Sequence, residues 1–146
     1  MRLRHRALPS LGEQQLINSE FKLLCESLGF YTSKHIVDYI KHFTTQQLAI
    51  RPVDYWRNGK ANEVFQIPEY ILVEMQKLQQ RQFQLVKRES DKLLTGEPIT
   101  YKYMFKDPEK MWFVYPELDG LPVSFLNQIL IRLNVHLDYF ENYERG

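Results

Sequence analysis

The sequence predicts a mainly α-helical protein with a small α+β part in its C-terminal half. Two observations lead to this fold class. Apolar residues recur three and four positions apart over most of the 146-residue chain, which is the spacing of one face of an α-helix. Only one run, PITYKYMFK at residues 98–106, alternates apolar and polar side chains as a half-buried β-strand does. We therefore expect several helices and one short strand.

The N-terminal segment is expected to hold a tail and then a helix. Residues 1–12 contain three arginines and little periodicity, so we expect a flexible basic tail that is either frayed or touches phosphate. Residues 13–28 place apolar side chains at helical spacing, and Gly29 follows as a helix stop. The first helix is therefore expected over residues 13–28.

Two shorter helices are expected next. Thr32 or Ser33 can cap the segment SKHIVDYIKHF, whose apolar and charged side chains fall on opposite faces of a helix. A third helix can begin at Ile50 or Arg51, because the proline that follows is tolerated in a first helical turn. Gly59 ends this helix, so the first half of the chain holds three short helices.

The C-terminal half is expected to contain a long helix, the strand and two further helices. The long helix covers about residues 68–94 and ends before Gly96. After the strand, Asp107 and the proline behind it form a strong helix start, so we expect a short helix over residues 107–114. A last helix over about residues 122–141 carries a wide apolar stripe and must be buried.

The long helix allows two packing arrangements. Ile71, Leu78 and Leu85 are seven residues apart, which is the spacing of a coiled-coil seam that pairs with a second chain. The same stripe can pack on the helix's own domain, and the sequence leaves both arrangements open.

The chain divides into three regions by pattern. We expect the flexible tail at residues 1–12, a DNA-binding unit at residues 13–66 and a C-terminal unit at residues 67–146. Residues 1–66 carry nine basic against six acidic side chains, whereas residues 67–146 carry ten against twelve. The net charge of the whole chain is only +1, so the charge imbalance between the halves is mild.

The sequence offers no recognisable catalytic or metal-binding motif. The single cysteine, Cys25, lies among leucines, which predicts a buried rather than a reactive thiol. His35 and His42 are seven residues apart, whereas pairs of metal ligands on one helix prefer three or four. We therefore expect no enzyme activity, no metal and no cofactor.

The start of the chain has no apolar run of signal-peptide length, and no segment approaches the roughly 20 apolar residues that cross a bilayer. We expect a cytoplasmic protein without a membrane partner.

The stretch RPVDYWRNGK at residues 51–60 combines an apolar and a polar face in few residues. Val53 and Trp56 are three apart and share a face, which we expect to anchor the helix in the domain. Tyr55 can lie on either face, and the basic and amide side chains can lie outward. This suits the recognition helix of a helix-turn-helix unit, which is held from behind while it offers hydrogen-bonding and cationic groups to DNA.

These residues resemble a known family. RPVDYWRNGK resembles the end of the DNA-reading helix of lambda-repressor-like helix-turn-helix proteins. The stretch from about residue 19 to 140 is similar to the anti-CRISPR-associated (Aca) repressors and their YdiL-type relatives. In that family a Tyr-Trp pair followed by x-x-Gly-Arg/Lys ends the recognition helix, and the match here is Tyr55-Trp56 with Gly59-Lys60. The family order continues with a long helix, an aromatic strand, a short Asp-containing helix and a C-terminal helix, matched here by residues 68–94, TGEPITYKY, DPEKMWF and PVSFLNQILIRL.

The chain departs from the family pattern in two places. Arg57 stands where members usually carry Glu, which makes the site more basic. The link KHFTTQQLA is about five residues longer than the family turn, and the additional polar residues include Gln46 and Gln47.

The resemblance implies a lambda-repressor-like helix-turn-helix domain followed by a C-terminal dimerisation domain with a short strand and helices. It also implies repression of the protein's own phage or mobile-element operon, by a homodimer on an inverted repeat in double-stranded DNA. Two copies related by a two-fold axis would read two half-sites, because one short helix reads few bases. The side chains expected to face DNA are Lys34, Lys41, Gln46, Gln47, Arg51, Asp54, Tyr55, Arg57, Asn58 and Lys60. The side chains expected to hold the dimer together are Phe125, Ile129, Leu133 and Leu137.

Two other functions stay open. The long Gln-rich helix could serve a protein-binding module, such as an antitoxin or a phage inhibitor. The same dimer could also bind RNA, because a transcribed inverted repeat folds into a hairpin.

Overall fold

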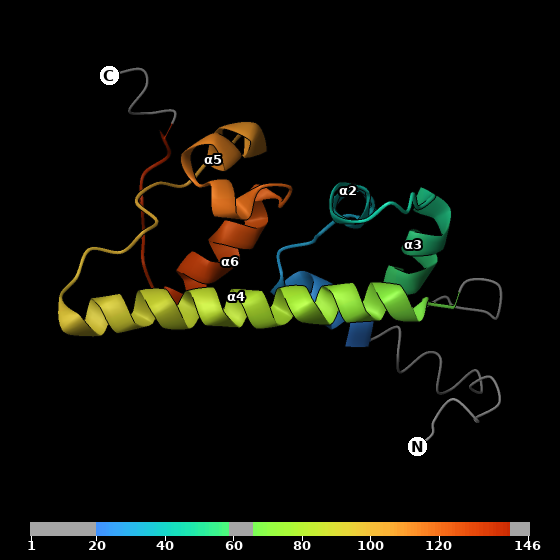
Figure 1. Ribbon diagram of the computed structural model, residues 1–146, viewed down its shortest axis with the longest axis horizontal. Coiled ribbons are helices and arrows are strands. Elements are labelled where there is room, and N and C mark those ends of the chain that lie inside the picture. Colours follow the sequence, from blue (N-terminus) through green and yellow to red (C-terminus); the bar gives the residue numbers. More distant parts are fainter. Residues whose placement is uncertain (1–19, 59–65, 141–146) are drawn as a thin grey trace.

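A single long helix organises the described part of the chain. The computed structural model describes residues 20–58 and 66–140, and this part is mainly helical, as the sequence predicts. Helix α4 runs the length of the molecule in Figure 1, with α2 and α3 beside its N-terminal half and α5 and α6 beside its C-terminal half. The named helices are α2 (Ser33–Phe43), α3 (Ile50–Asn58), α4 (Glu69–Thr95), α5 (Pro108–Val114), the 3₁₀ turn η3 (Pro116–Leu118) and α6 (Val123–Leu133). None of the helices in residues 20–58 and 66–140 has the length and apolar character needed to cross a membrane.

The helices of the N-terminal half begin and end at the expected signals. Residues 20–27 are helical, and Gly29 follows in the left-handed conformation at φ 83°. The Thr32 side chain accepts a hydrogen bond from the backbone N–H of His35, which makes Thr32 the N-cap of α2. Helix α3 spans the predicted residues. The expected tail, the start of the first helix and Gly59 lie outside the described residues.

The core of this half forms where the three helices meet. The buried apolar side chains come from one face of each helix, in agreement with the predicted periodicity. Cys25 is fully buried, and burial raises the pKa of its thiol to about 12. The predicted burial of this cysteine is therefore confirmed. The side chains at this junction include Phe21, Cys25, Leu28, Ile36, Ile40, Val53 and Trp56.

Helix α4 packs its predicted seam on the chain itself. Ile71 and Leu78 have exposed fractions of 0% and 2%, and Leu85 has 8%. Gly96 ends the helix in the left-handed conformation, and its backbone N–H donates to the carbonyls of Lys92 and Leu93. Of the two arrangements that the heptad spacing allowed, the single chain adopts packing on its own domain.

The prediction of a β-strand at residues 98–106 is wrong. Within the described residues the segment makes one isolated bridge, between Met104 and Tyr139, and no sheet. Side chains satisfy backbone groups that a neighbouring strand would otherwise bond. The backbone N–H of Thr100 donates to the Glu89 carboxylate, and the N–H of Lys102 donates to the Tyr115 hydroxyl at 2.6 Å. The predicted alternation survives as burial, because Tyr101 and Phe105 are buried at 0% and 2% exposure.

Helices α5 and α6 follow, and the second is shorter than predicted. The Asp107 carboxylate accepts from the backbone N–H of Glu109 at 2.9 Å, which confirms the predicted helix start. Helix α6 ends at Leu133, eight residues before the predicted end, because Asn134 adopts a left-handed conformation at φ 55°. Residues 135–138 then have no regular secondary structure, and Met104 exchanges backbone hydrogen bonds with Asp138 and Phe140.

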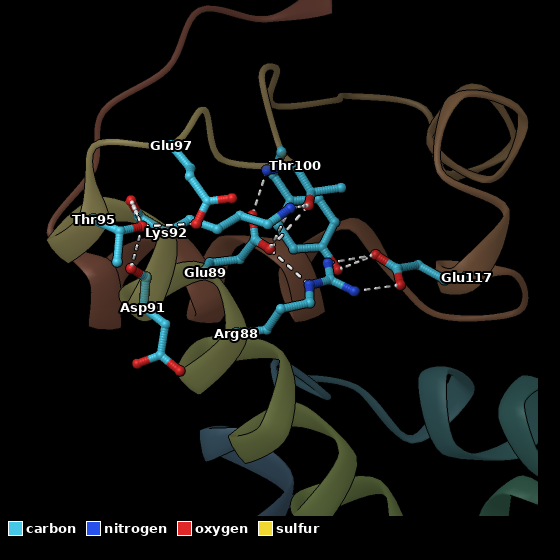
Figure 2. A network of polar contacts seen from close by, with 9 residues as sticks. Arg88, Glu89, Asp91, Lys92, Thr95, Glu97, Thr100 and Glu117 are labelled. Atoms are coloured by element: carbon cyan, nitrogen blue, oxygen red, sulfur yellow. Dashed lines mark hydrogen bonds and ion pairs between the residues drawn. The ribbon is translucent and has the colours of Figure 1, made fainter.

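A polar network fastens the C-terminal segments to α4 (Figure 2). Arg88 donates to both carboxylate oxygens of Glu117, at 3.0 and 2.9 Å, and to Glu89 at 2.7 Å. Glu89 has no exposed surface and also accepts from the backbone and hydroxyl of Thr100. The Tyr101 hydroxyl donates to Glu117 at 2.6 Å. The network therefore joins α4 to the segment before α5 and to η3.

A second set of contacts joins the two halves of the chain. Ser124, the second residue of α6, donates its hydroxyl to the Gly29 carbonyl. Arg132 donates to the Ser27 carbonyl at 2.8 Å and to the Gln82 side chain at 2.5 Å. Helix α6 is thereby bonded both to α4 and to the end of the first helix.

Candidate nucleic-acid interface

Helix α3 is anchored by its predicted apolar face. Val53 has no exposed surface, and Trp56 is 3% exposed. The Trp56 ring meets the Phe21 ring edge to face, with centroids 6.2 Å apart. Aromatic pairs favour this geometry. Trp56 is therefore a core anchor, as the sequence predicts, and it fixes α3 against the first helix.

Two side chains expected to face DNA bind the start of α2 instead. Arg57 donates to the Tyr31 carbonyl at 2.6 Å and to the Ser33 hydroxyl at 3.5 Å. Asp54 accepts a hydrogen bond from the same hydroxyl. Both side chains are half-buried. The expectation that they lie outward is corrected, because the first turn of α2 supplies polar partners that hold them within the domain.

The exposed surface of α3 and of the link before it carries the other candidates. Arg51 and Asn58 are exposed at the two ends of α3. Gln46 and Gln47 are exposed in the link. Tyr55 is half-buried and makes contacts of its own. Lys60 lies outside the described residues. Among the described candidates on α3 and in the link, the exposed side chains are therefore those of Gln46 and Gln47 before α3 and of Arg51 and Asn58 on it.

The link between α2 and α3 is six residues long, at 44–49. Thr44 is the C-cap of α2, and its backbone N–H and its hydroxyl both donate to the Ile40 carbonyl, at 2.9 and 2.6 Å. The same hydroxyl accepts from the backbone N–H of Gln46 at 3.0 Å. A DNA-binding helix-turn-helix usually has a turn of three or four residues. The link is therefore longer than that turn by two or three residues rather than by the expected five, because Lys41, His42 and Phe43 still belong to α2.

The charged side chains of α2 have different surroundings. Lys34 pairs with Asp38 at 2.5 Å, and both are exposed. His35 accepts a hydrogen bond on Nδ1 from the Tyr31 backbone N–H at 3.1 Å. Burial lowers the pKa of His35 below its ordinary value, against the opposing effect of Asp38, so the ring is neutral at pH 7. Lys41 is exposed and borders a pocket that α2 shares with α5 and α6.

The side chains expected at a dimer interface divide into two groups. Phe125 and Ile129 have no exposed surface in the single chain. The expectation that they contact a second copy is corrected, because they complete the core between α6 and α4. Leu133 and Leu137 are half-buried and retain some surface. Leu137 lies in the irregular segment after α6 rather than on the helix.

Two features of this region could not be anticipated from the sequence. The bond between Arg57 and Tyr31 spans 26 residues, and no periodicity in either segment indicates it. The pocket beside Lys41 combines α2 with a turn some 80 residues later, so no local motif marks it. Within the described residues, no group of three or more His, Cys, Asp or Glu side chains is placed to hold a metal ion.

Comparisons with protein-family models, with curated proteins and with solved structures found no match.

Proposed function

We propose that this protein is a sequence-specific DNA-binding repressor that acts as a homodimer on an inverted repeat and regulates its own operon. The observation that carries the proposal is the two-sided character of α3. Val53 and Trp56 are buried, whereas Arg51 and Asn58 are exposed. A recognition helix needs this division, because its angle is fixed by the buried face and its contacts are made by the other.

The surroundings of α3 support the same proposal. Gln46 and Gln47 are exposed just before the helix, and glutamine can pair with adenine in the major groove. Arg57 and Asp54 are held by α2, so they fix the position of α3 rather than read bases. The resemblance to the Aca and YdiL-type repressors also favours this function.

The proposed homodimer must use side chains with surface to offer. Phe125 and Ile129 are excluded from direct contact by their burial. Leu133 and Leu137 remain available from the predicted set. Light scattering on the purified protein gives the oligomeric state independently of DNA.

The proposal is tested by the binding of a fluorescent duplex from immediately upstream of the gene. We expect saturable binding to an inverted repeat and a linear fall of log affinity with log salt between about 50 and 200 mM, because phosphate contacts release counterions. Arg51→Ala should weaken binding by about ten-fold, the effect of one lost base or phosphate contact. Lys77→Ala is the matched control, since Lys77 is 69% exposed on α4 and lies outside the candidate site.

The proposal fails if the wild-type protein does not bind the duplex at physiological salt, or if Arg51→Ala binds as tightly as the control. Competition with leader RNA distinguishes a DNA repressor from an RNA-hairpin binder.

A specific observation favours a protein-binding module as the second candidate. Phe83 on α4 is 68% exposed and lies beside Gln79, Gln80 and Gln84 at the rim of a hollow between α4 and α6. Exposed aromatic side chains are enriched at protein interfaces. This function predicts a partner in pull-downs that Phe83→Ser abolishes, together with no shift of any duplex.

A further inference from the structure

A pocket of about 590 Å³ lies between α2 and the turn that connects α5 to α6. Figure 1 shows this turn reaching from α6 toward α2. Nε2 of His42 in α2 lies 3.3 Å from a carboxylate oxygen of Asp119 in the turn. The His42 ring also packs on Gly120, where an added Cβ would overlap it. The pocket is therefore an open hollow between segments that contact each other, and its volume is in the range of small-molecule sites, roughly 300–1,000 Å³.

The walls contributed by the C-terminal half are flat and apolar. They consist of the indole ring of Trp112, the rings of Pro108 and Pro122, and the side chains of Leu121 and Val123. Trp112 is fixed in place because its Nε1–H donates to the Leu121 carbonyl at 2.7 Å. A fixed indole face and two proline rings suit a planar apolar body, because aromatic groups stack on such surfaces.

The charged side of the pocket comes from α2. Asp38 forms an ion pair with Lys34 at 2.5 Å, and an Asp119 carboxylate oxygen lies 3.3 Å from Nε2 of His42. Lys41 has no ion pair with any residue in the described ranges 20–58 and 66–140. Lys41 therefore offers an ammonium group at the rim of an apolar pocket, which favours an anionic ligand group.

We infer that this pocket is a binding site for a small planar aromatic carboxylate. The aromatic body lies against Trp112 and the prolines, and the carboxylate meets the ammonium group of Lys41. The inference does not depend on DNA binding, because every group it uses lies outside α3 and the link before it.

The test uses 2-naphthoate as the probe and ¹H–¹⁵N NMR of the full-length protein. The chain has two tryptophans, so two indole N–H signals are expected, and Trp112→Phe assigns them. Titration with 2-naphthoate should move the Trp112 signal to saturation and leave the signal of the buried Trp56 in place. The neutral isostere 2-naphthamide should bind about ten-fold more weakly, because it lacks the charge that Lys41 attracts.

Variants separate the two parts of the site. Lys41→Gln should lower the affinity for 2-naphthoate by about ten-fold and leave that for 2-naphthamide unchanged. Val123→Trp should fill the pocket and weaken both probes. Lys77→Gln is the matched control and should bind both probes as the wild type does. An unchanged Trp56 signal shows that each variant is folded.

Three outcomes would overturn the inference: no saturable shift of the Trp112 signal at millimolar probe, equal affinity for the two probes, or no effect of Lys41→Gln. Because no DNA is present, failure of the proposed repressor function leaves the result of this titration unaffected.

Discussion

The two arginines of α3 differ in burial and in hydrogen bonding. Arg51 is exposed in the first turn, whereas Arg57 is half-buried in the last turn and bonded to Tyr31 and Ser33. The difference follows from their positions on α3. Arg57 follows the buried Trp56 and lies close enough to the start of α2 to bond it, while Arg51 lies at the exposed start of the helix. The structure therefore gives Arg57 a role in stability and leaves Arg51 exposed.

This assignment predicts unequal effects of two substitutions on stability. Arg57→Ala should lower the free energy of unfolding by about 1–3 kcal/mol, because it leaves the Tyr31 carbonyl without its charged donor. Arg51→Ala should change it by less than about 0.5 kcal/mol, as exposed substitutions usually do. Urea unfolding followed by circular dichroism measures both, and equal losses would contradict the assignment.

At the scale of the element, α4 depends on ionised carboxylates. Burial raises the pKa of Glu89, but hydrogen bonds from Arg88 and Thr100 outweigh burial and hold the pKa below its ordinary value. The bidentate bond from Arg88 likewise lowers the pKa of Glu117. A carboxylate whose pKa is lower in the folded state stabilises that state above the unfolded pKa, which is about 4.3 for Glu.

The network therefore predicts a stability that is constant near neutral pH and falls as the pH drops below about 4.3 toward the folded pKa values. Glu89→Gln should lower the free energy of unfolding at pH 7 by about 2 kcal/mol, since the charged acceptor of Arg88 is lost. The free energy of unfolding of this variant should also depend less on pH below about 4.3. Urea titrations from pH 3 to pH 7 measure this effect.

Glu26→Gln is the control for this prediction, because Glu26 is exposed on the first helix. If Glu89→Gln and Glu26→Gln follow the same pH curve, the network contributes nothing to acid stability.

At the scale of the whole molecule, one glycine controls how closely the two halves approach. Gly29 and Gly96 both have positive φ, at 83° and 78°. A Cβ on Gly29 would overlap the backbone of Ser124 and Phe125 at the start of α6. A Cβ on Gly96 would have no heavy atom within 4 Å. A side chain at either position would suffer the same backbone strain, but only at Gly29 would it also overlap α6.

Gly96→Ala should therefore cost about 1–2 kcal/mol, the strain of a left-handed residue with a side chain. Gly29→Ala should cost at least about 3 kcal/mol, because α6 must also move away from the first helix. Equilibrium unfolding of both variants gives the difference. Similar losses would show that the two halves do not rely on this contact.

The sequence by itself determined where most helices begin and end. Thr32 and Asp107 were recognisable as caps, and Gly96 as a stop, because these signals act within a few residues of the helix they bound. The apolar spacing likewise identified Trp56 as buried. Such features depend on local backbone chemistry and on periodicity, which one chain displays without its fold.

Only the tertiary structure decided which surfaces remain available. It paired Arg57 with Tyr31, buried Phe125 against α4 and gave the backbone of the expected strand side-chain partners in place of a sheet. It also brought Lys41 and Trp112 to the lining of one pocket, which no single segment of the sequence indicates. The physical reason is the same in each case. These outcomes depend on contacts between residues far apart in the chain, and local pattern carries no information about which distant groups meet.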